Sequence, residues 1–217
     1  MKKYLIKIIL GVAFIASPIA SRAQFYQIAN QLPGLISPAL TGGLNYKGYV
    51  DASYVAGLGN TSADFLGFST SQGFRYKSWF FMGVGIGVDV AMSHTGDDFY
   101  RPSNYSYTST GVMIPVFTDF RFNVGNTAKA TFFADVKIGA SFLMGNSYLA
   151  INNGYLSNRQ YFYLKPAVGV RIPVGKNGKQ GVNVGVTYQL LTSNYWYGSS
   201  HTSPTLNSLG ATVGFDW

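Results

Sequence analysis

Residues 80–91, which read FFMGVGIGVDVA, decide the fold. Every second residue from Phe80 to Val90 is large and apolar, whereas Gly83, Gly85 and Gly87 alternate with them on the other side. Successive side chains of a β-strand point to opposite faces of the sheet. The stretch therefore predicts a strand with one apolar face and one small or polar face.

The same period of two recurs along the chain. It is clear in residues 130–144, 182–190 and 209–217, and weaker in residues 46–56, 65–76, 112–124 and 161–173. Pro115 and Pro166 interrupt two of the weaker segments, because proline cannot donate to a strand ladder. The eight segments predict an all-β protein, an eight-stranded antiparallel transmembrane up-and-down β-barrel.

The connections between these segments alternate in length. Residues 76–78, 125–128 and 175–179 are short, and Asn177-Gly178 is a tight-hairpin signal. Residues 94–111, 145–159 and 193–204 are long and polar. Outer-membrane barrels have short periplasmic turns and long external loops, so both termini are expected in the periplasm. The connection at 57–63 departs from this rule, because it is expected outside yet is short.

The composition decides which face of the barrel is apolar. Of the residues, 47% are hydrophobic and only 11% are charged, against about 25% charged in an average soluble domain. A soluble ligand-binding barrel, the alternative, needs a charged exterior, whereas the second face of these strands is rich in glycine and serine. We therefore expect the apolar face to contact lipid and the small or polar face to fill a narrow interior.

The first 44 residues are expected to lie outside the barrel. Residues 1–23 have the Lys2 and Lys3 charge, the Ile8–Ala16 apolar run and the Ser21-Arg22-Ala23 cleavage site of a signal peptide. That run is too short for a transmembrane anchor, and no cysteine follows it to carry a lipid. Residues 24–44 form a periplasmic segment whose structure, a plug or a helix, stays open, and residues 45–217 form the barrel.

Removal of the leader lowers the net charge. The full chain carries +8, but the mature chain keeps 12 basic and 8 acidic residues, a net charge of +4. The mature chain has no cluster of lysine and arginine, so we expect no nucleic-acid partner.

Eleven charged residues fall on the inward face, six basic and five acidic. They are Lys47, Asp51, Arg75, Asp89, Asp119, Arg121, Asp135, Lys137, Lys165, Arg171 and Asp216. Unpaired charges are costly in a poorly hydrated interior, so we expect a salt-bridge network that closes the lumen. A water-filled lumen with separately solvated charges is the alternative.

Aromatic residues are expected at the two membrane interfaces, where amphipathic rings are favoured. The turn side carries Tyr76, Trp79, Phe80 and Trp217. The opposite rim is expected to carry Tyr148, Tyr161, Tyr195, Trp196 and Tyr197.

Three stretches resemble the bacterial outer-membrane β-barrel-domain family. They are residues 46–51 (YKGYVD), 80–85 (FFMGVG) and the closing 213–217 (VGFDW), and the resemblance covers about residues 45–217. It implies an outer-membrane location and contact with outer-membrane lipid. It also implies that the end of the chain, with Phe215 and Trp217, is the signal that barrel-assembly machinery recognises during insertion. It implies no activity, since most members lack an assigned role.

Enzyme chemistry is not expected. His94 beside Ser93, or His201 near serines, could form part of a hydrolase site, but serine is so common in these loops that coincidence explains the pairs better. The Gly83–Gly87 stretch is followed by no helix and is no dinucleotide motif. Asp97 and Asp98 lack further spaced ligands for a cation. We predict no catalytic residue, no metal and no cofactor.

The loops are the remaining candidates for binding. Their candidate contact residues are Asp97, Asp98, Tyr100, Arg101, Tyr195, Trp196 and Tyr197. Loops rich in tyrosine, serine and asparagine resemble binding surfaces, although solvated loops have the same composition. We expect a monomer with a structural or interaction role, which binds another envelope protein or a surface ligand. A narrow channel is the first alternative and a lipid-modifying enzyme the second.

Overall fold

The computed structural model describes most of the expected barrel. The described residues are 44–59, 63–93, 107–125, 129–151, 154–156, 159–174, 178–193, 195–197, 200–202 and 205–217. The expected signal peptide and nearly all of the expected periplasmic segment, residues 1–43, lie outside them.

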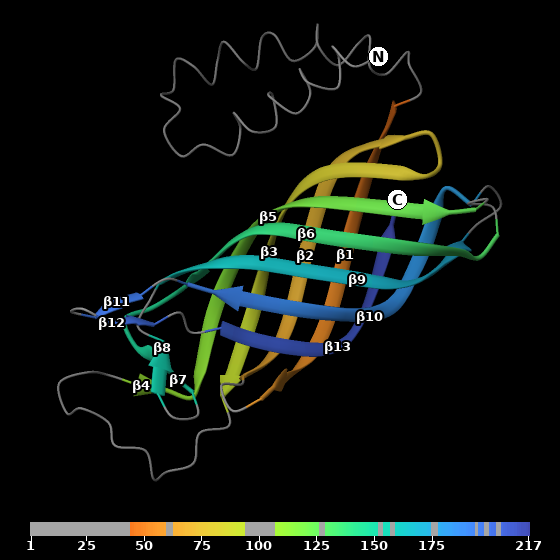
Figure 1. The fold of residues 1–217 in the computed structure, drawn as a ribbon. Coiled ribbons are helices and arrows are strands. Elements are labelled where there is room, and N and C mark those ends of the chain that lie inside the picture. Colours follow the sequence, from red (N-terminus) through yellow and green to blue (C-terminus); the bar gives the residue numbers. More distant parts are fainter. Residues whose placement is uncertain are drawn as a thin grey trace, which may run out of the picture. The chain divides into compact units, whose positions relative to one another are not determined.

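Eight long strands close into an antiparallel barrel, which confirms the predicted fold class (Figure 1). They are β1 (Leu44–Leu58), β2 (Ala63–Tyr76), β3 (Phe80–Ser93), β5 (Thr110–Val124), β6 (Thr131–Leu143), β9 (Gln160–Val174), β10 (Gln180–Thr192) and β13 (Thr205–Asp216). Each strand lies beside the long strands that precede and follow it in the sequence, and β13 pairs with β1. The closed sheet therefore has no free edge whose backbone would need water.

Pro115 in β5 and Pro166 in β9 are accommodated inside the strands by local gaps in pairing. The ladder of β3 with β5 runs to Ile86 opposite Val116 and resumes, in the same register, at Asp89 opposite Met113. Pro115 falls in that gap. The ladder of β9 with β10 has an equivalent gap between Ala167 and Leu164, at Pro166. Each gap follows from the missing proline N–H, and each strand continues past it.

The two ends of the barrel differ. At the turn end, short connections join β2 to β3, β5 to β6 and β9 to β10. Strand β1 begins at this end and strand β13 finishes there. At the loop end, further short strands occur in the longer connections (Figure 1). They are β4 (Tyr107–Thr108), β7 (Tyr148–Ile151), β8 (Gly154–Leu156), β11 (Tyr195–Tyr197) and β12 (Ser200–Thr202). Strand β4 pairs parallel with β7, β7 antiparallel with β8, and β11 antiparallel with β12.

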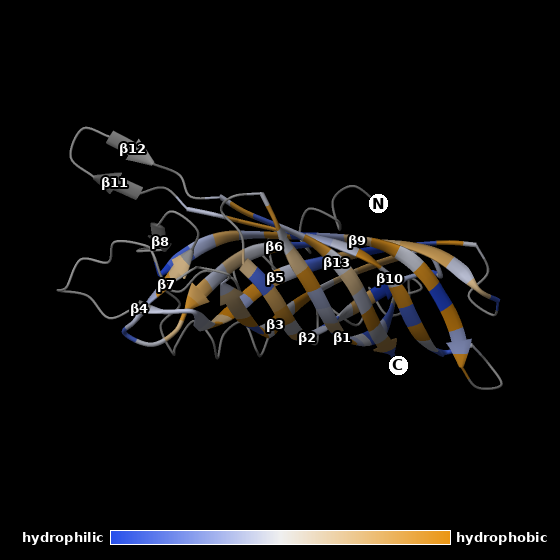
Figure 2. Ribbon diagram, turned by 90° about the horizontal axis from the view of Figure 1, so that it is seen from below, coloured by the Kyte–Doolittle hydropathy of each residue, from blue (hydrophilic) through white to orange (hydrophobic). Residues whose placement is uncertain are grey.

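The apolar side chains of the long strands point outward. In β3, Val84, Ile86 and Val88 are exposed, whereas Phe81 and Asp89 on the other face are buried. Figure 2 shows the resulting alternation of hydrophobic and hydrophilic residues along the barrel strands. This is the sidedness expected from the sequence. Among the described residues, no helix is both long and apolar enough to cross a bilayer.

Large apolar side chains also fill the interior at the loop end, which the sequence analysis did not anticipate. This apolar layer consists of Val55, Ala63, Phe65, Ala91, Met113, Phe117, Leu143, Leu149, Tyr161, Tyr163, Leu191 and Leu206. Leu149 comes from the short strand β7 and the others from the barrel strands. The expectation that Tyr161 lies at the membrane interface is wrong, because its side chain shares the inward face of β9 with Tyr163.

Candidate functional site

The charged residues assigned to the inward face lie inside the barrel. Ten of the eleven are buried, namely Lys47, Asp51, Asp89, Asp119, Arg121, Asp135, Lys137, Lys165, Arg171 and Asp216. Arg75 is half-buried, on the same face of β2 as the buried Ser71 and Gly73. The ten buried residues form three groups at different positions along the lumen.

The central group joins opposite sides of the barrel. The Nη2 atom of Arg121 lies 3.0 Å from Oδ2 of Asp51 and 2.9 Å from Oδ2 of Asp135. The ammonium of Lys137 pairs with the same two carboxylates, at 3.2 Å from Asp51. Asp119 accepts a hydrogen bond from the Ser71 hydroxyl at 2.5 Å. Two cations, from β5 and β6, are thus shared between the carboxylates of Asp51 on β1 and Asp135 on β6.

Aromatic rings enclose this group. The guanidinium carbon of Arg121 lies 4.0 Å from the ring centroid of Tyr49 and 5.3 Å from that of Phe133. The ammonium of Lys137 lies 6.0 Å from the centroid of Phe117. Stacking of a desolvated cation on a ring face is favourable and excludes water from the ion pairs. Arg121 is therefore held by aromatic rings as well as by carboxylates.

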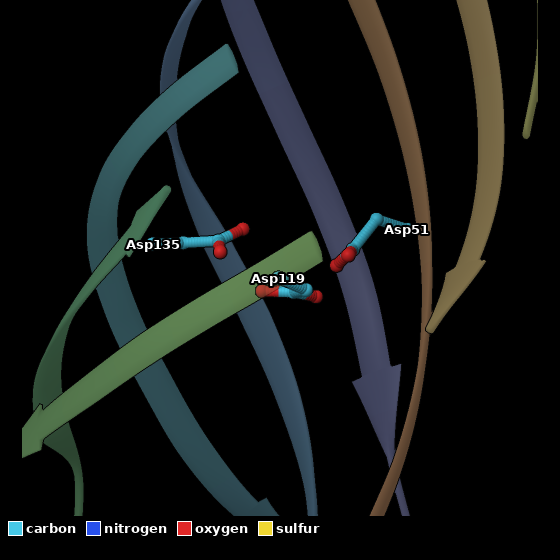
Figure 3. Close-up of side chains that lie close together, drawn as sticks. All are labelled: Asp51, Asp119 and Asp135. Carbon is cyan, nitrogen blue, oxygen red and sulfur yellow. The ribbon is translucent and has the colours of Figure 1, made fainter. Parts of the chain in front are cut away.

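Three carboxylates of the central group are close enough to bind one cation. Asp51, Asp119 and Asp135 each have an oxygen within 4.8 Å of the others, and Figure 3 shows them converging from their strands. However, Arg121 and Lys137 already supply positive charge to Asp51 and Asp135. The arrangement fits an internal ion-pair network better than a metal site, because the protein provides its own cations.

The second group lies at the turn end, around Asp216. Arg171 donates to both oxygens of this carboxylate, from Nε and Nη2, each at 2.8 Å. Lys47 forms an ion pair with the same group, and Asn183 donates to it at 3.1 Å. Arg171 and Lys47 also donate to the carbonyl oxygens of Gly178 and Lys179. The group therefore attaches the connection between β9 and β10 to the last strand.

The third group lies nearer the loop end than the other two groups. In it, Gln189 donates to Asp89 at 3.3 Å and Lys165 donates to Ser53 at 2.8 Å. Gly67 makes room for it. A Cβ atom at Gly67 would lie 2.4 Å from Oδ1 of Asp89 and 3.3 Å from Nζ of Lys165. Both charges thus approach the same small volume, which only a glycine leaves open.

The sequence analysis missed the neutral partners of the network. Ser53, Ser71, Asn183 and Gln189 all accept or donate within it. The signal was available for all four: Ser53 and Ser71 lie at even spacings from Asp51 and Arg75 on their own strands, and Asn183 and Gln189 alternate with the outward apolar residues of β10. Their small or neutral side chains drew no attention beside the charged residues.

The candidate contact residues of the loops lie wholly or partly outside the described residues. Asp97, Asp98, Tyr100 and Arg101 lie outside the described residues. Tyr195, Trp196 and Tyr197 form β11, whose backbone pairs with β12, but their side chains lie outside the described part. The histidines expected to have no catalytic role are in the same position: His94 is not described, and only the backbone of His201 is, in β12.

The aromatic end of the chain forms part of the barrel wall. Trp217 exchanges backbone hydrogen bonds with Gly48, at 3.2 Å and 3.1 Å. Its indole is exposed on the outside and stacks with Phe215, with 6.4 Å between centroids. A Cβ atom at Gly48 would lie 2.5 Å from this indole, so glycine is needed beside it. The two aromatic residues of the expected insertion signal thus lie at the seam where the barrel closes.

Comparison with known proteins supports the fold. No family model and no curated protein matches the sequence. Among solved structures, Neisserial surface protein A (NspA) is similar with a TM-score of 0.50 and 12% identity, over 80% of this chain and 97% of that chain. The N-terminal β-barrel domain of Pseudomonas aeruginosa OprF has a TM-score of 0.44 and 10% identity, over 79% of this chain and 97% of its own. The fold implied by the family resemblance is confirmed by the likeness to NspA.

Proposed function

We propose that this chain is an integral outer-membrane barrel with a structural or interaction role, and that its lumen is closed. The observation that carries the proposal is the distribution of polarity: charges lie inside the barrel, and large apolar side chains cover the outside. In water this arrangement would expose a continuous apolar surface, whereas in a bilayer it is favourable. Closed antiparallel sheets with an apolar exterior cross the bacterial outer membrane, and the chain shares its fold with a solved Neisserial surface protein.

Two barriers in series support a closed lumen. At the loop end, the rings of Phe117 and Tyr163 lie with 5.9 Å between centroids and belong to the buried apolar layer. Toward the turn end, Arg121 bridges Asp51 and Asp135 across the interior. Eight strands leave a lumen that side chains can fill, so an open pore would require both barriers to move.

The proposed interaction role follows from the surfaces that a partner can still reach. The described interior is filled by ion pairs and by the buried apolar layer, so the parts available to a partner are the outer surface and the loop end. Both termini are proposed to face the periplasm, together with the short turns, as in other outer-membrane barrels. The loops would then be presented outside the cell, to another envelope protein or a surface ligand.

Gel mobility in detergent, before and after boiling, tests the membrane part of the proposal. A closed barrel stays compact in detergent at room temperature and migrates differently once boiling unfolds it. We expect two bands of different mobility, and we expect the purified chain to require detergent for solubility. A chain that stays dissolved without detergent would contradict the proposal.

Conductance across a planar bilayer tests the closed lumen separately. We expect the reconstituted barrel to produce no discrete openings. Regular openings of constant size would instead favour the narrow channel. Insertion of the unmodified barrel is checked separately by its compact band on an unheated gel, and the double variant Phe117→Ser with Arg121→Ser, which weakens both barriers, should produce openings where it inserts.

A further inference from the structure

The lysines of the described residues have an uneven distribution. Lys47, Lys137 and Lys165 are buried inside the barrel, and the remaining described lysines, Lys77, Lys129 and Lys179, are exposed. All three exposed lysines lie in the connections at the turn end, beside the ends of β2, β6 and β10. The loop end has no exposed lysine in the part of the chain that the structure describes.

Negative charge does not balance these lysines. The carboxylate nearest the turn end, Asp216, is fully buried and paired with Arg171 and Lys47. The other described acidic residues lie inside the lumen or, like Asp64, near the loop end of β2. The exposed side-chain charge of the described turn-end rim is therefore entirely positive.

Aromatic side chains locate this rim at the boundary of the apolar surface. Trp79 is exposed, and its indole lies 6.5 Å from the ring of Tyr76 and 6.2 Å from that of Phe122, between centroids. The ammonium of Lys77 lies 5.4 Å from the ring centroid of Tyr76. Such rings favour the level of lipid headgroups.

The second lysine lies at the same boundary. Val124 and Phe132, which are 69% and 71% exposed, flank the connection that contains Lys129. The apolar exterior thus continues to the last residues of the strands, and the lysines follow directly after it. In a bilayer, this order along the chain would bring their ammonium groups close to the level of the lipid phosphates.

We infer that this rim, Lys77, Lys129 and Lys179 with Trp79 and Trp217, binds the headgroups of anionic phospholipids in the leaflet that surrounds the turn end. The inference rests on the proposed membrane function and adds a lipid class to it. An exposed lysine at a membrane surface favours an anionic over a zwitterionic lipid roughly fivefold. Three lysines around the rim would select several such lipids, and tryptophan would anchor beside them.

Quenching of tryptophan by brominated lipids tests the inference directly. The chain has three tryptophans, and a Trp196→Phe background leaves Trp79 and Trp217, both at the rim. The barrel is inserted into vesicles of phosphatidylcholine with one-fifth phosphatidylglycerol. In one sample only the phosphatidylglycerol carries bromine, and in a second an equal fraction of phosphatidylcholine carries it. We expect stronger quenching in the first sample, corresponding to a severalfold local enrichment, and we expect 0.5 M salt to reduce it.

Two rim variants provide the matched comparison. Lys77→Gln, Lys129→Gln and Lys179→Gln together should remove most of the difference between the two samples, whereas the three lysine-to-arginine changes should keep it. Equal quenching for the unmodified rim, with the barrel inserted, overturns the inference and leaves the membrane proposal intact. A barrel that enters neither kind of vesicle overturns both.

Discussion

Arg121 and Asp51 form an ion pair across the lumen, with 3.0 Å between Nη2 and Oδ2, although their strands β5 and β1 are not neighbours in the barrel. Strands β3 and β2 lie between them in the wall. The pair therefore connects two strands across the interior, and the two strands do not hydrogen-bond to each other in the sheet. Both side chains are buried, so each charge depends on the other to offset the cost of its removal from water.

Removal of Arg121 should destabilise the barrel strongly. Arg121→Met leaves Asp51 and Asp135 buried with only Lys137 to compensate them. Loss of one partner from a buried ion pair costs about 3–5 kcal/mol. The free energy of unfolding, measured by urea titration of the vesicle-inserted barrel with tryptophan fluorescence, should fall by that amount.

The control for this change is Gln160→Met, which removes an exposed polar side chain away from the rim and should cost less than about 1 kcal/mol. Adding Asp51→Asn to Arg121→Met should recover part of the loss, because one unpaired charge disappears. Strictly additive effects of the two changes would show that the charges act independently and would contradict the network.

Opposite faces of one strand should respond differently to arginine. Val186 on β10 is 54% exposed and Thr187 is 2% exposed. Near the midplane, Val186→Arg should cost about 2–4 kcal/mol in a bilayer, because the guanidinium enters hydrocarbon. Thr187→Arg adds volume and charge to the packed lumen, and its cost should depend on pH and on the neighbouring carboxylates. Unfolding in vesicles measures both, and a harmless Val186→Arg would contradict the assignment of faces.

The apolar layer should tolerate truncation less well than the outer surface. Leu191 is fully buried in the layer, whereas its neighbour Leu190 is half-buried on the outer face. Leu191→Ala leaves a cavity that the rigid barrel cannot fill, at a cost of about 2–5 kcal/mol. Acyl chains can fill the space left by Leu190→Ala, so this change should cost much less. Equal losses of unfolding free energy would mean that Leu191 is not packed as described.

Two glycines of the barrel wall should differ in their tolerance of a methyl group. A Cβ atom at Gly139 would lie 2.0 Å from the backbone oxygen of Val116, so the backbone would have to move. At Gly111 the nearest atom is the flexible end of Leu143, at 3.1 Å. Gly139→Ala should lower the unfolding free energy by about 1–3 kcal/mol and slow insertion, whereas Gly111→Ala should change it by less. The yield of the compact band on unheated gels gives the first comparison, and a stable Gly139→Ala would contradict the close approach of β5 and β6.

The sequence by itself determined the strands and their faces. A period of two assigns each residue to one side, and the low content of charge assigns the apolar side to lipid, so Asp119, Arg121 and their counterparts could be placed inside before any pairing was known. The short strands within the long connections, in contrast, have too few residues for a period to be visible.

Only the tertiary structure decided which inward residues meet. A partner across the lumen depends on the stagger between strands that closes the barrel, as for Asp51 on β1 and Arg121 on β5. The apolar layer has the same origin. Phe65, Tyr161 and Leu206 occupy inward positions far apart in the sequence, and closure of the sheet brings them to the same end of the interior. Alternation fixes direction, but it carries no information about distance along or across the barrel.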